Sequence, residues 1–271
     1  MMDTHDSSDF LSRILAQKRR ELEAAQQRLP ERQLRDLAEK AQKRRSLVQR
    51  MIVPGRQGVN IIAEIKRASP SRGPIRPDLD VEAYATAYER GGAAAISILT
   101  DREHFHGDPD DLLRVRKKTQ LPLLRKDFLI APYQLYESVV LGADAVLLIV
   151  RAISEELLAD CLSLCRVLQL DALVEVHSEA ELEQATRAGA LLIGINNRDL
   201  RTFKTDLQTS VRLSRHLAIG QIAVAESGIS ERRDVELLLA AGIWNFLIGE
   251  SLVRAADPEQ FLKVLMGNPQ V

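Results

Sequence analysis

The sequence of 271 residues predicts a single α/β catalytic domain, a (β/α)8 TIM barrel preceded by a helical extension. Three observations lead to this fold. Short apolar runs recur eight times after residue 60, stretches with helical periodicity separate them, and glycine ends several of the predicted helices. Strands of a parallel sheet are buried on both faces, so they appear as nearly continuous apolar runs rather than alternating ones.

The first 50 residues are predicted to form the helical extension, and residues 51–60 a connection that opens the barrel domain, residues 51–271. The first helix is expected to carry an apolar stripe on one face, formed by Phe10, Leu11, Ile14 and Leu15. A second helix is expected to follow Pro30 and to run on through Leu47. Twelve Lys or Arg residues stand against eight Asp or Glu in the extension, and we interpret this basic excess as a solvated face.

Eight apolar runs are predicted to be the barrel strands, with amphipathic helices between them. The runs span residues 61–65, 94–99, 121–124, 145–150, 172–176, 191–195, 222–225 and 245–248. Glycine, which accepts the left-handed conformation that ends a helix, precedes four of them, at Gly92, Gly142, Gly189 and Gly242. A doubly wound parallel sheet is the alternative, but it generally has fewer strands and a Gly-rich turn after the first.

Composition and charge exclude several classes of protein. With 45% hydrophobic and 28% charged residues, the chain has the make-up of a globular protein with a sizeable core. A formal net charge of −1 gives no reason to expect a nucleic-acid partner. The longest wholly apolar run, residues 145–150, is too short to span a membrane, and the N-terminus lacks a signal-peptide pattern, so we expect a cytoplasmic protein.

Cysteine and histidine give no indication of a metal site or of a disulfide framework. Cys161 and Cys165 are the two cysteines, and their spacing places them on one face of a predicted helix. His104 and His106 share a loop without a third ligand in sequence, so we expect no metal. We expect a monomer, or at most a weak dimer.

The ends of the predicted strands carry the candidate active site, because this fold takes its catalytic groups from the C-terminal strand ends and the loops that follow. Glu64 and Lys66 end the first strand, and their spacing of two turns both side chains to one face. Charged side chains inside a barrel are costly unless they are paired. Since several strands end in charged residues, we predict one shared cavity; a mutually neutralised rim network is the alternative.

We expect the substrate to be bound through a phosphate group, because barrels of this kind often bind phosphate with the loops after the last two strands. Those loops hold Ser227, Gly228 and Gly249, which can offer backbone N–H groups. Ser69 and Ser71 in the first loop add hydroxyl donors. The sequence therefore predicts a small phosphorylated substrate.

Eight segments, in their order and spacing, resemble the indole-3-glycerol phosphate synthase family over nearly the whole chain. The segments are IIAEIKRASPS, ILTDREHF, LPLLRKDF, GADAVLLIV, LVEVH, IGINNRDL, VAESGI and FLIGESL. The resemblance implies closure of a pyrrole ring in 1-(2-carboxyphenylamino)-1-deoxyribulose 5-phosphate, followed by loss of CO2 and of water. The implied product is indole-3-glycerol phosphate, in tryptophan biosynthesis, and the family uses no cofactor or metal.

The resemblance also implies roles for the charged residues, motif by motif. Lys126 in LRKDF matches the general acid that protonates the substrate carbonyl oxygen. Glu175 in LVEVH matches the general base or acid of the dehydration, and Lys66 in EIKRASPS matches a second catalytic lysine. Glu64 resembles the carboxylate that positions the lysines, and the division of labour between Lys66 and Glu175 stays open.

Binding residues follow from the same motifs. Asn196 and Glu226 resemble groups that hydrogen-bond the anilino and ribulose portions of the substrate, and Arg198 resembles a partner for a carboxylate of protein or substrate. Four residues resemble phosphate ligands, namely Ser69, Ser227, Gly228 and Gly249. Glu250 would repel a phosphate, so we expect it to offer only its backbone.

Three aromatic residues and one histidine near these motifs could belong either to the site or to its surroundings. Phe105 is a candidate for packing on an aromatic substrate, whereas Phe128 and Trp244 are expected in the core. His177 is expected to face away from Glu175 and to line the rim.

Two other functions compete with the synthase. A phosphoribosylanthranilate isomerase of the same fold would be expected to use a Cys/Asp pair near strand ends, whereas both cysteines here lie in a predicted helix. A barrel that only binds a phosphorylated ligand would have no need for the costly charged interior that Lys66, Lys126 and Glu175 create.

Overall fold

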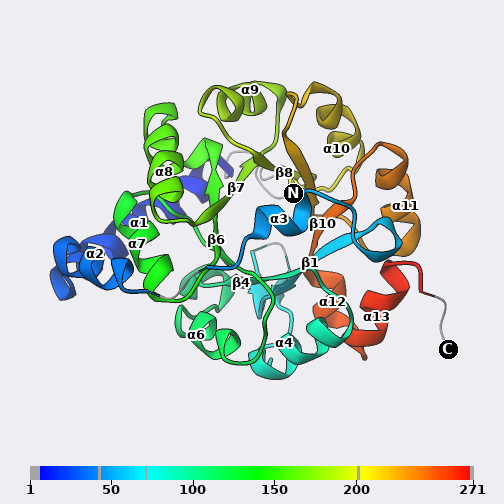
Figure 1. Ribbon diagram of the computed structural model, residues 1–271, viewed down its shortest axis with the longest axis horizontal. Coiled ribbons are helices and arrows are strands. Elements are labelled where there is room, and N and C mark those ends of the chain that lie inside the picture. The colour runs from blue at the N-terminus through cyan, green and yellow to red at the C-terminus, as the bar shows by residue number, and fades with distance from the viewer. Residues whose placement is uncertain (1–6, 42–43, 71, 200–201, 269–271) are drawn as a thin grey trace.

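The described residues form a closed barrel of eight parallel strands with helices around it, as Figure 1 shows. The structure is a computed structural model and describes residues 7–41, 44–70, 72–199 and 202–268. In order of pairing, the strands are β1 (Asn60–Ile65), β10 (Asn245–Ile248), β9 (Ile222–Glu226), β8 (Leu192–Asn196), β7 (Asp171–Val176), β6 (Ala145–Ile149), β5 (Leu123–Lys126) and β4 (Ala95–Leu99). Pairing of β4 with β1 closes the barrel.

Each of the eight predicted runs overlaps one of these strands, so the (β/α)8 barrel is confirmed and the doubly wound sheet is wrong. The run at 121–124 is displaced by two residues from β5, because Pro122 has no N–H for a ladder and the strand continues through the charged Lys126. The loop after β1 holds a short hairpin that the sequence did not predict, β2 (Ala68–Ser69) paired with β3 (Gly73–Pro74).

Helices surround the barrel (Figure 1). They are α4 (Val81–Arg90), α5 (Arg102–Phe105), α6 (Asp110–Arg116), α7 (Pro132–Val140), α8 (Glu155–Val167), α9 (Glu179–Arg187), α10 (Gln208–Leu213), α11 (Arg232–Ala240), α12 (Glu250–Arg254) and α13 (Pro258–Leu265), with short 3-10 turns η1 (Arg56–Gly58), η2 (Val150–Ala152) and η3 (Ser214–His216). All of these but η1, which precedes β1, and α12 and α13, which follow β10, lie between successive barrel strands. Gly142, with φ of 83°, follows α7 in the left-handed conformation that the sequence predicted.

The extension holds α1 (Ser7–Arg28), α2 (Glu31–Glu39) and α3 (Leu47–Met51). The predicted second helix is too long, because α2 ends at Glu39 and Leu47 begins α3, where the Ser46 side chain accepts from a backbone N–H. Leu47 and Met51 are fully buried and pack against side chains from inside the barrel, so α3 closes its N-terminal end (Figure 1). The domain boundary at residue 51 stays a prediction.

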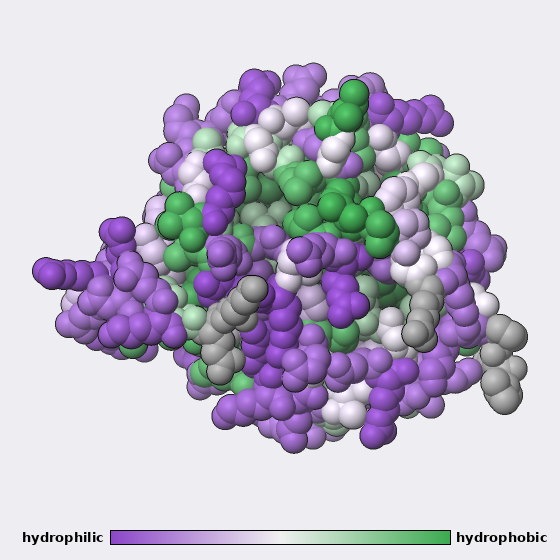
Figure 2. Space-filling view, viewed as in Figure 1, coloured by the Kyte–Doolittle hydropathy of each residue, from purple (hydrophilic) through white to green (hydrophobic). Residues whose placement is uncertain are grey.

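Hydrophilic side chains cover most of the outer helices, α2 among them, while hydrophobic ones gather near the middle of the same face (Figure 2). The large apolar side chains exposed on the molecule include Ile52, Val53 and Ile219. Nowhere in the described ranges does a helix have both the length and the apolar character needed to cross a membrane.

Candidate active site

A cavity of about 450 Å³ lies among the C-terminal ends of the strands, where the sequence predicted the active site. All the predicted site residues line it, namely Glu64, Lys66, Ser69, Phe105, Lys126, Glu175, Asn196, Arg198, Glu226, Ser227, Gly228 and Gly249. Ser71, predicted to add a hydroxyl donor, lies outside the described residues. The barrel therefore brings the predicted set together, and the role of each member stays a prediction.

Lys126 ends β5 and places its ammonium between two glutamates of other strands. Its Nζ lies 3.4 Å from Glu175 Oε2 and 3.5 Å from Glu226 Oε2. Burial alone would lower its pKa, but the charges of Glu226, Glu175 and Glu64 raise the pKa above the ordinary value. Lys126 therefore carries its proton at neutral pH.

Glu64 and Lys66 form a second ion pair at the end of β1, with 2.7 Å between Glu64 Oε1 and Lys66 Nζ. Burial disfavours the ionised form of Glu64, yet the charges of Lys66 and Lys126 lower its pKa below the usual value. A Cβ on Gly249 would collide with Glu64 Oε1. Gly249 thus makes room for this carboxylate, a task the sequence did not predict.

Glu226 and Glu175 are two buried carboxylates whose pKa values are pushed apart. Burial, and then the charges of the neighbouring carboxylates, raise the pKa of Glu226 to about 8. Burial acts on Glu175 in the same direction, but Lys126, His177 and a hydrogen bond from Asn196 lower its pKa. At neutral pH Glu226 is mainly protonated and Glu175 ionised, which is the separation that acid–base chemistry requires.

The residues predicted to bind phosphate include a hydroxyl group and backbone segments that a ligand could contact. Ser69 Oγ is buried, with no hydrogen-bond partner among the described residues. Ser227 and Gly228 follow β9 with φ of 67° and 81°, and a positive φ is uncommon for any residue other than glycine. A buried hydroxyl without a partner and a glycine that lets a ligand approach the backbone both suit a phosphate.

Three arginines surround Glu250, which follows Gly249 at the cavity wall. Glu250 Oε1 lies 3.2 Å from Arg72 Nε and 3.3 Å from Arg254 Nε, and its Oε2 lies 3.8 Å from Arg198 Nη2. Arg198 was predicted to partner a carboxylate, and here that carboxylate belongs to the protein. Arg72 and Arg254 also line the cavity and were not predicted, because they stand outside the strand ends.

Aromatic side chains line part of the cavity. Phe105 and Phe128 lie with their ring centroids 6.3 Å apart, and both line it. Phe128, which was expected in the core, is partly buried and packs against the core cluster inside the barrel, and it also lines the cavity. Trp244 lies away from the cavity, and its Nε1 donates to the backbone carbonyl of Met51 in α3.

Helix α1 closes part of the cavity with an apolar stripe. Phe10, Leu11 and Ile14 line it, and the Phe10 ring meets Phe203 edge to face with 6.0 Å between centroids. The sequence showed this stripe but not what it packs against. An apolar stripe on a helix outside the barrel was the available signal that the extension covers something.

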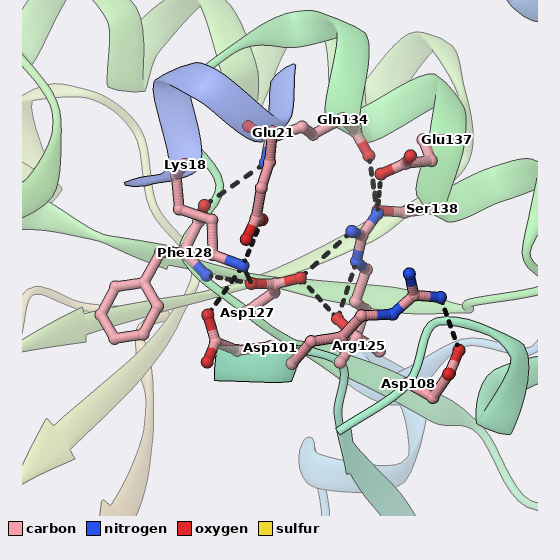
Figure 3. Close-up of polar contacts among 12 residues, drawn as sticks. Lys18, Glu21, Asp101, Asp108, Arg125, Asp127, Phe128, Gln134, Glu137 and Ser138 are labelled. Carbon is pink, nitrogen blue, oxygen red and sulfur yellow. Dashed lines mark hydrogen bonds and ion pairs between the residues drawn. The ribbon is translucent and has the colours of Figure 1, made fainter. Parts of the chain in front are cut away.

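Lys18 joins α1 to the barrel, as Figure 3 shows. Its Nζ lies 2.8 Å from Asp101 Oδ2 and 2.9 Å from Asp127 Oδ1, and each of the three side chains is at most 3% exposed. Burial would lower the pKa of Lys18, but Asp127 and Asp101 raise it above the ordinary value. The interpretation of the basic excess as a solvated face is therefore wrong for this residue.

Both aspartates also hold segments that line the cavity, and Figure 3 shows the contact of Asp127 with Phe128. Asp101 Oδ1 accepts a backbone N–H of α5 at 2.7 Å, and α5 carries Phe105. Asp127 Oδ1 accepts the N–H of Phe128 at 2.8 Å. Burial would raise the pKa of Asp127, but the buried cations beside it lower the pKa to about 2. Lys18 thus fixes the extension to the segments that follow β4 and β5.

His177 lies against Glu175, although it was expected to face away. Its Nε2 is 3.5 Å from Glu175 Oε1, its Nδ1 is 3.2 Å from Glu181 Oε2, and its side chain is 6% exposed. Residues two apart along an extended chain share a side, which explains the contact. The expectation of a rim position is therefore wrong.

Metal-ligating side chains do not gather in the part of the chain that is described, where no group of three or more His, Cys, Asp or Glu is arranged to hold an ion. Cys161 and Cys165 are buried free thiols in α8. Burial raises their pKa values to about 11 and about 12, so neither is an active nucleophile at neutral pH.

Known structures and sequences resemble the chain at two levels. A thiamine phosphate pyrophosphorylase from Pyrococcus furiosus superposes with a TM-score of 0.58 at 17% identity, covering 76% of this chain and 93% of that one, which is a likeness of fold alone. Curated proteins named indole-3-glycerol phosphate synthase are far more similar. That of Syntrophobacter fumaroxidans is 56% identical over 96% of this chain and 98% of its own length, and that of Desulfosudis oleivorans is 52% identical over 96% and 99%.

The family model described as indole-3-glycerol phosphate synthase matches residues 11–265, which include α1 as well as the barrel. The matched range includes every residue that was predicted for the site and that lines the cavity. The chain belongs to the indole-3-glycerol phosphate synthase family.

Proposed function

We propose that the protein converts 1-(2-carboxyphenylamino)-1-deoxyribulose 5-phosphate to indole-3-glycerol phosphate by ring closure, loss of CO2 and loss of water. One observation carries the proposal: the buried ammonium of Lys126 lies between Glu175 and Glu226 in a cavity that also holds the partnerless hydroxyl of Ser69. Family membership supports the same reaction.

Lys126 is the proposed general acid of ring closure. The reaction places negative charge on the substrate carbonyl oxygen as the new carbon–carbon bond forms, and a proton from Lys126 Nζ neutralises it. The raised pKa supports this role because it keeps the ammonium form available. Glu175 and Glu226 orient the ammonium in the cavity.

Glu175 and Lys66 are the proposed proton-transfer groups of the dehydration. Glu175 is ionised and suits the base that removes a proton from the ring-closed intermediate. Lys66 suits the acid that protonates the departing hydroxyl, and Glu64 holds Lys66 at 2.7 Å for this step. The loss of water thus needs no group beyond these side chains and the substrate.

The remaining residues divide between the two ends of the substrate. We assign the phosphate to Ser69, Ser227, Gly228 and Gly249. Phe105 packs on the aromatic portion, and Asn196 and the protonated Glu226 hydrogen-bond the anilino and ribulose portions. Arg198 partners a carboxylate, as its contact with Glu250 illustrates.

Product formation tests the proposal directly. Purified protein mixed with the carboxyphenylamino-deoxyribulose phosphate, without added metal, should yield a fluorescent indole product. Lys126→Ala should lose about 10³-fold in turnover, the range of general acid catalysis, while substrate still binds. Lys117→Ala, which removes an exposed lysine, is the matched control. Absence of product from folded wild-type protein would refute the function, and near-full turnover of Lys126→Ala would refute the acid.

We also propose that the enzyme acts as a monomer in the cytoplasm. Every residue named in the site comes from one chain, and the free thiols of Cys161 and Cys165 suit a reducing compartment. Sedimentation should then give a mass near 30.3 kDa, and a stable dimer at micromolar concentration would contradict it.

A further inference from the structure

We propose that His177 is a positioning residue that holds the Glu175 carboxylate from outside the cavity and exchanges a proton with it. The inference rests on the proposed function only in giving Glu175 its part in the dehydration. It concerns a group of residues, His177, Glu181 and Arg151, for which the sequence predicted no such part.

Glu175 has a charged or titratable neighbour on each of two sides, and His177 Nε2, on one of them, makes no hydrogen bond to any described residue. Lys126 lies on the cavity side, 3.4 Å from Oε2, and His177 Nε2 lies 3.5 Å from the other oxygen, Oε1. His177 is not among the residues that line the cavity. Its ring is therefore placed to act on the substrate only through Glu175.

Glu181 fixes the ring of His177 from behind. One oxygen, Oε2, accepts the backbone N–H of His177 at 2.8 Å and lies 3.2 Å from Nδ1 of the same residue. The other oxygen, Oε1, accepts from Arg151 Nε at 3.0 Å and from Nη2 at 2.5 Å. Burial would raise the pKa of Glu181, but the hydrogen bonds of His177 and Arg151 lower it, so the carboxylate is ionised.

The start of α9 fixes Glu181 in turn. Ser178 is the N-cap, and its Oγ accepts the backbone N–H of Glu181 at 3.3 Å. A Ser followed three residues later by Glu is a common helix start, in which the Glu side chain turns back toward the residues before the helix. Here that carboxylate reaches His177, so a helix-capping motif also orients a ring beside the active site.

This arrangement assigns a place to each proton. Glu181 is ionised and can only accept, so His177 Nδ1 donates to it and keeps its proton throughout. His177 Nε2 then faces Glu175 as the atom that gains and loses a proton. When Glu175 removes a proton from the substrate, that proton can pass to Nε2, which leaves Glu175 ionised beside an imidazolium held between two carboxylates. The same proton returns to Glu175 by the reverse transfer and leaves to solvent, and Lys66, which gave its proton to the departing hydroxyl, takes one from solvent before the next turnover.

The charged groups around this path include the carboxyls of Glu226 and Glu64, which interact with Glu175 across the cavity. Glu175 comes from β7, Glu181 from α9 and Arg151 from η2, and Lys126 reaches Glu175 from β5. A second pair on α9 offers a control, because Glu179 lies 3.8 Å from His216 at the surface, where both side chains are about half exposed.

Steady-state kinetics over a range of pH test the proposal with His177→Gln, Glu181→Gln, the double variant and His216→Gln. His177→Gln should lower kcat about 10-fold, less than loss of a direct proton donor, with KM changed less than about 2-fold. The acidic limb of its kcat profile should move to higher pH, because His177 lowers the pKa of Glu175 and the variant lacks that ring. His216→Gln should match wild type.

The double variant shows whether Glu181 acts through His177. Its kcat should equal that of His177→Gln alone, because Glu181 acts by orienting the His177 ring and that ring is already absent. Additive losses, or a kcat profile of His177→Gln that matches wild type, would overturn the proposal. His177→Asn serves in the same comparison if His177→Gln does not fold.

Nitrogen-15 NMR of the histidine ring gives a readout that needs neither activity nor a variant of the site. The proposal expects a proton on Nδ1 of His177 at every pH at which the protein is folded. An Nδ1 that lacks a proton at neutral pH would overturn the proposal. An inactive wild type with a protonated Nδ1 would refute the proposed function and leave the arrangement of the ring supported.

Discussion

Replacing Lys18 by Met should release α1 from the barrel while the barrel itself stays folded. The substitution keeps the length of the side chain and removes the charge that lies 2.8 Å from Asp101 and 2.9 Å from Asp127. Asp127 keeps its ion pair with Arg125 at 3.1 Å, whereas Asp101 loses its buried cation. The damage should therefore concentrate where α1 meets α5.

The magnitude follows from the burial of the three side chains. Removing one partner of a buried ion pair costs about 3–5 kcal/mol, because an uncompensated charge remains in the interior. Met recovers some apolar contact, so we expect about 3 kcal/mol, the lower end of that range. At 1.4 kcal/mol per factor of ten, the detached state of α1 should become about 100-fold more populated.

Amide hydrogen exchange measured on the full chain reports this equilibrium. Amides of α1 should exchange about 100-fold faster in Lys18→Met, whereas those of β5 and β6 should not change. The KM for substrate should also rise, because Phe10, Leu11 and Ile14 leave the cavity with the helix. Arg19→Met, which removes an exposed charge from the same helix, is the control. Equal exchange in the two variants would refute the reasoning.

Two further predictions come from the strand ends. Gly249→Ala should displace the Glu64 carboxylate and lower kcat at least about 10-fold in a folded protein. The control is Gly189→Ala, which has open space beside it and should lose only about 1 kcal/mol of stability. A Gly249→Ala variant with the kcat of wild type would contradict the packing argument. Folded protein binds the Glu226 proton more tightly than unfolded chain does, so this residue makes stability fall as pH rises from about 4.5 to about 8. Glu226→Gln removes that titration, so the Tm of the variant minus the Tm of wild type should increase as pH rises from about 4.5 to about 8. A constant difference in Tm would show that the pKa is not raised.

The fold and the main site residues were predictable because both depend on local patterns. Runs of apolar residues with glycine before them mark the strands, and the barrel topology places all C-terminal strand ends together. Glu64, Lys126 and Glu175 stand where an apolar run meets a charge. A sequence needs no tertiary information to show that.

The contributions from outside the strand ends were not predictable in the same way. The stripe that begins at Phe10 was visible, but its docking surface depends on where α1 turns back over the barrel. Lys18 looked like one of twelve basic residues in the extension, and only its position between two aspartates separates it from the rest. The contact of His177 with Glu181 spans a strand end and a helix start, two elements assigned independently.

The sequence also shows which residues can carry a charge, but not which of them are protonated at neutral pH. The proposed proton transfers depend on those protonation states. Lys66, Lys126, Glu64, Glu175 and Glu226 would carry a net charge of −1 if all were ionised. Burial, and then the charges of Glu175 and Glu64, raise the pKa of Glu226 to about 8, although Lys126 at 3.5 Å acts in the opposite direction. A protonated Glu226 brings the group to neutrality at pH 7. This distribution of protons supports the proposed roles of Lys126 as the acid, Glu175 as the base and Glu226 as a neutral donor. A neutral group of five also admits an anionic substrate without the repulsion that a fully ionised set would impose.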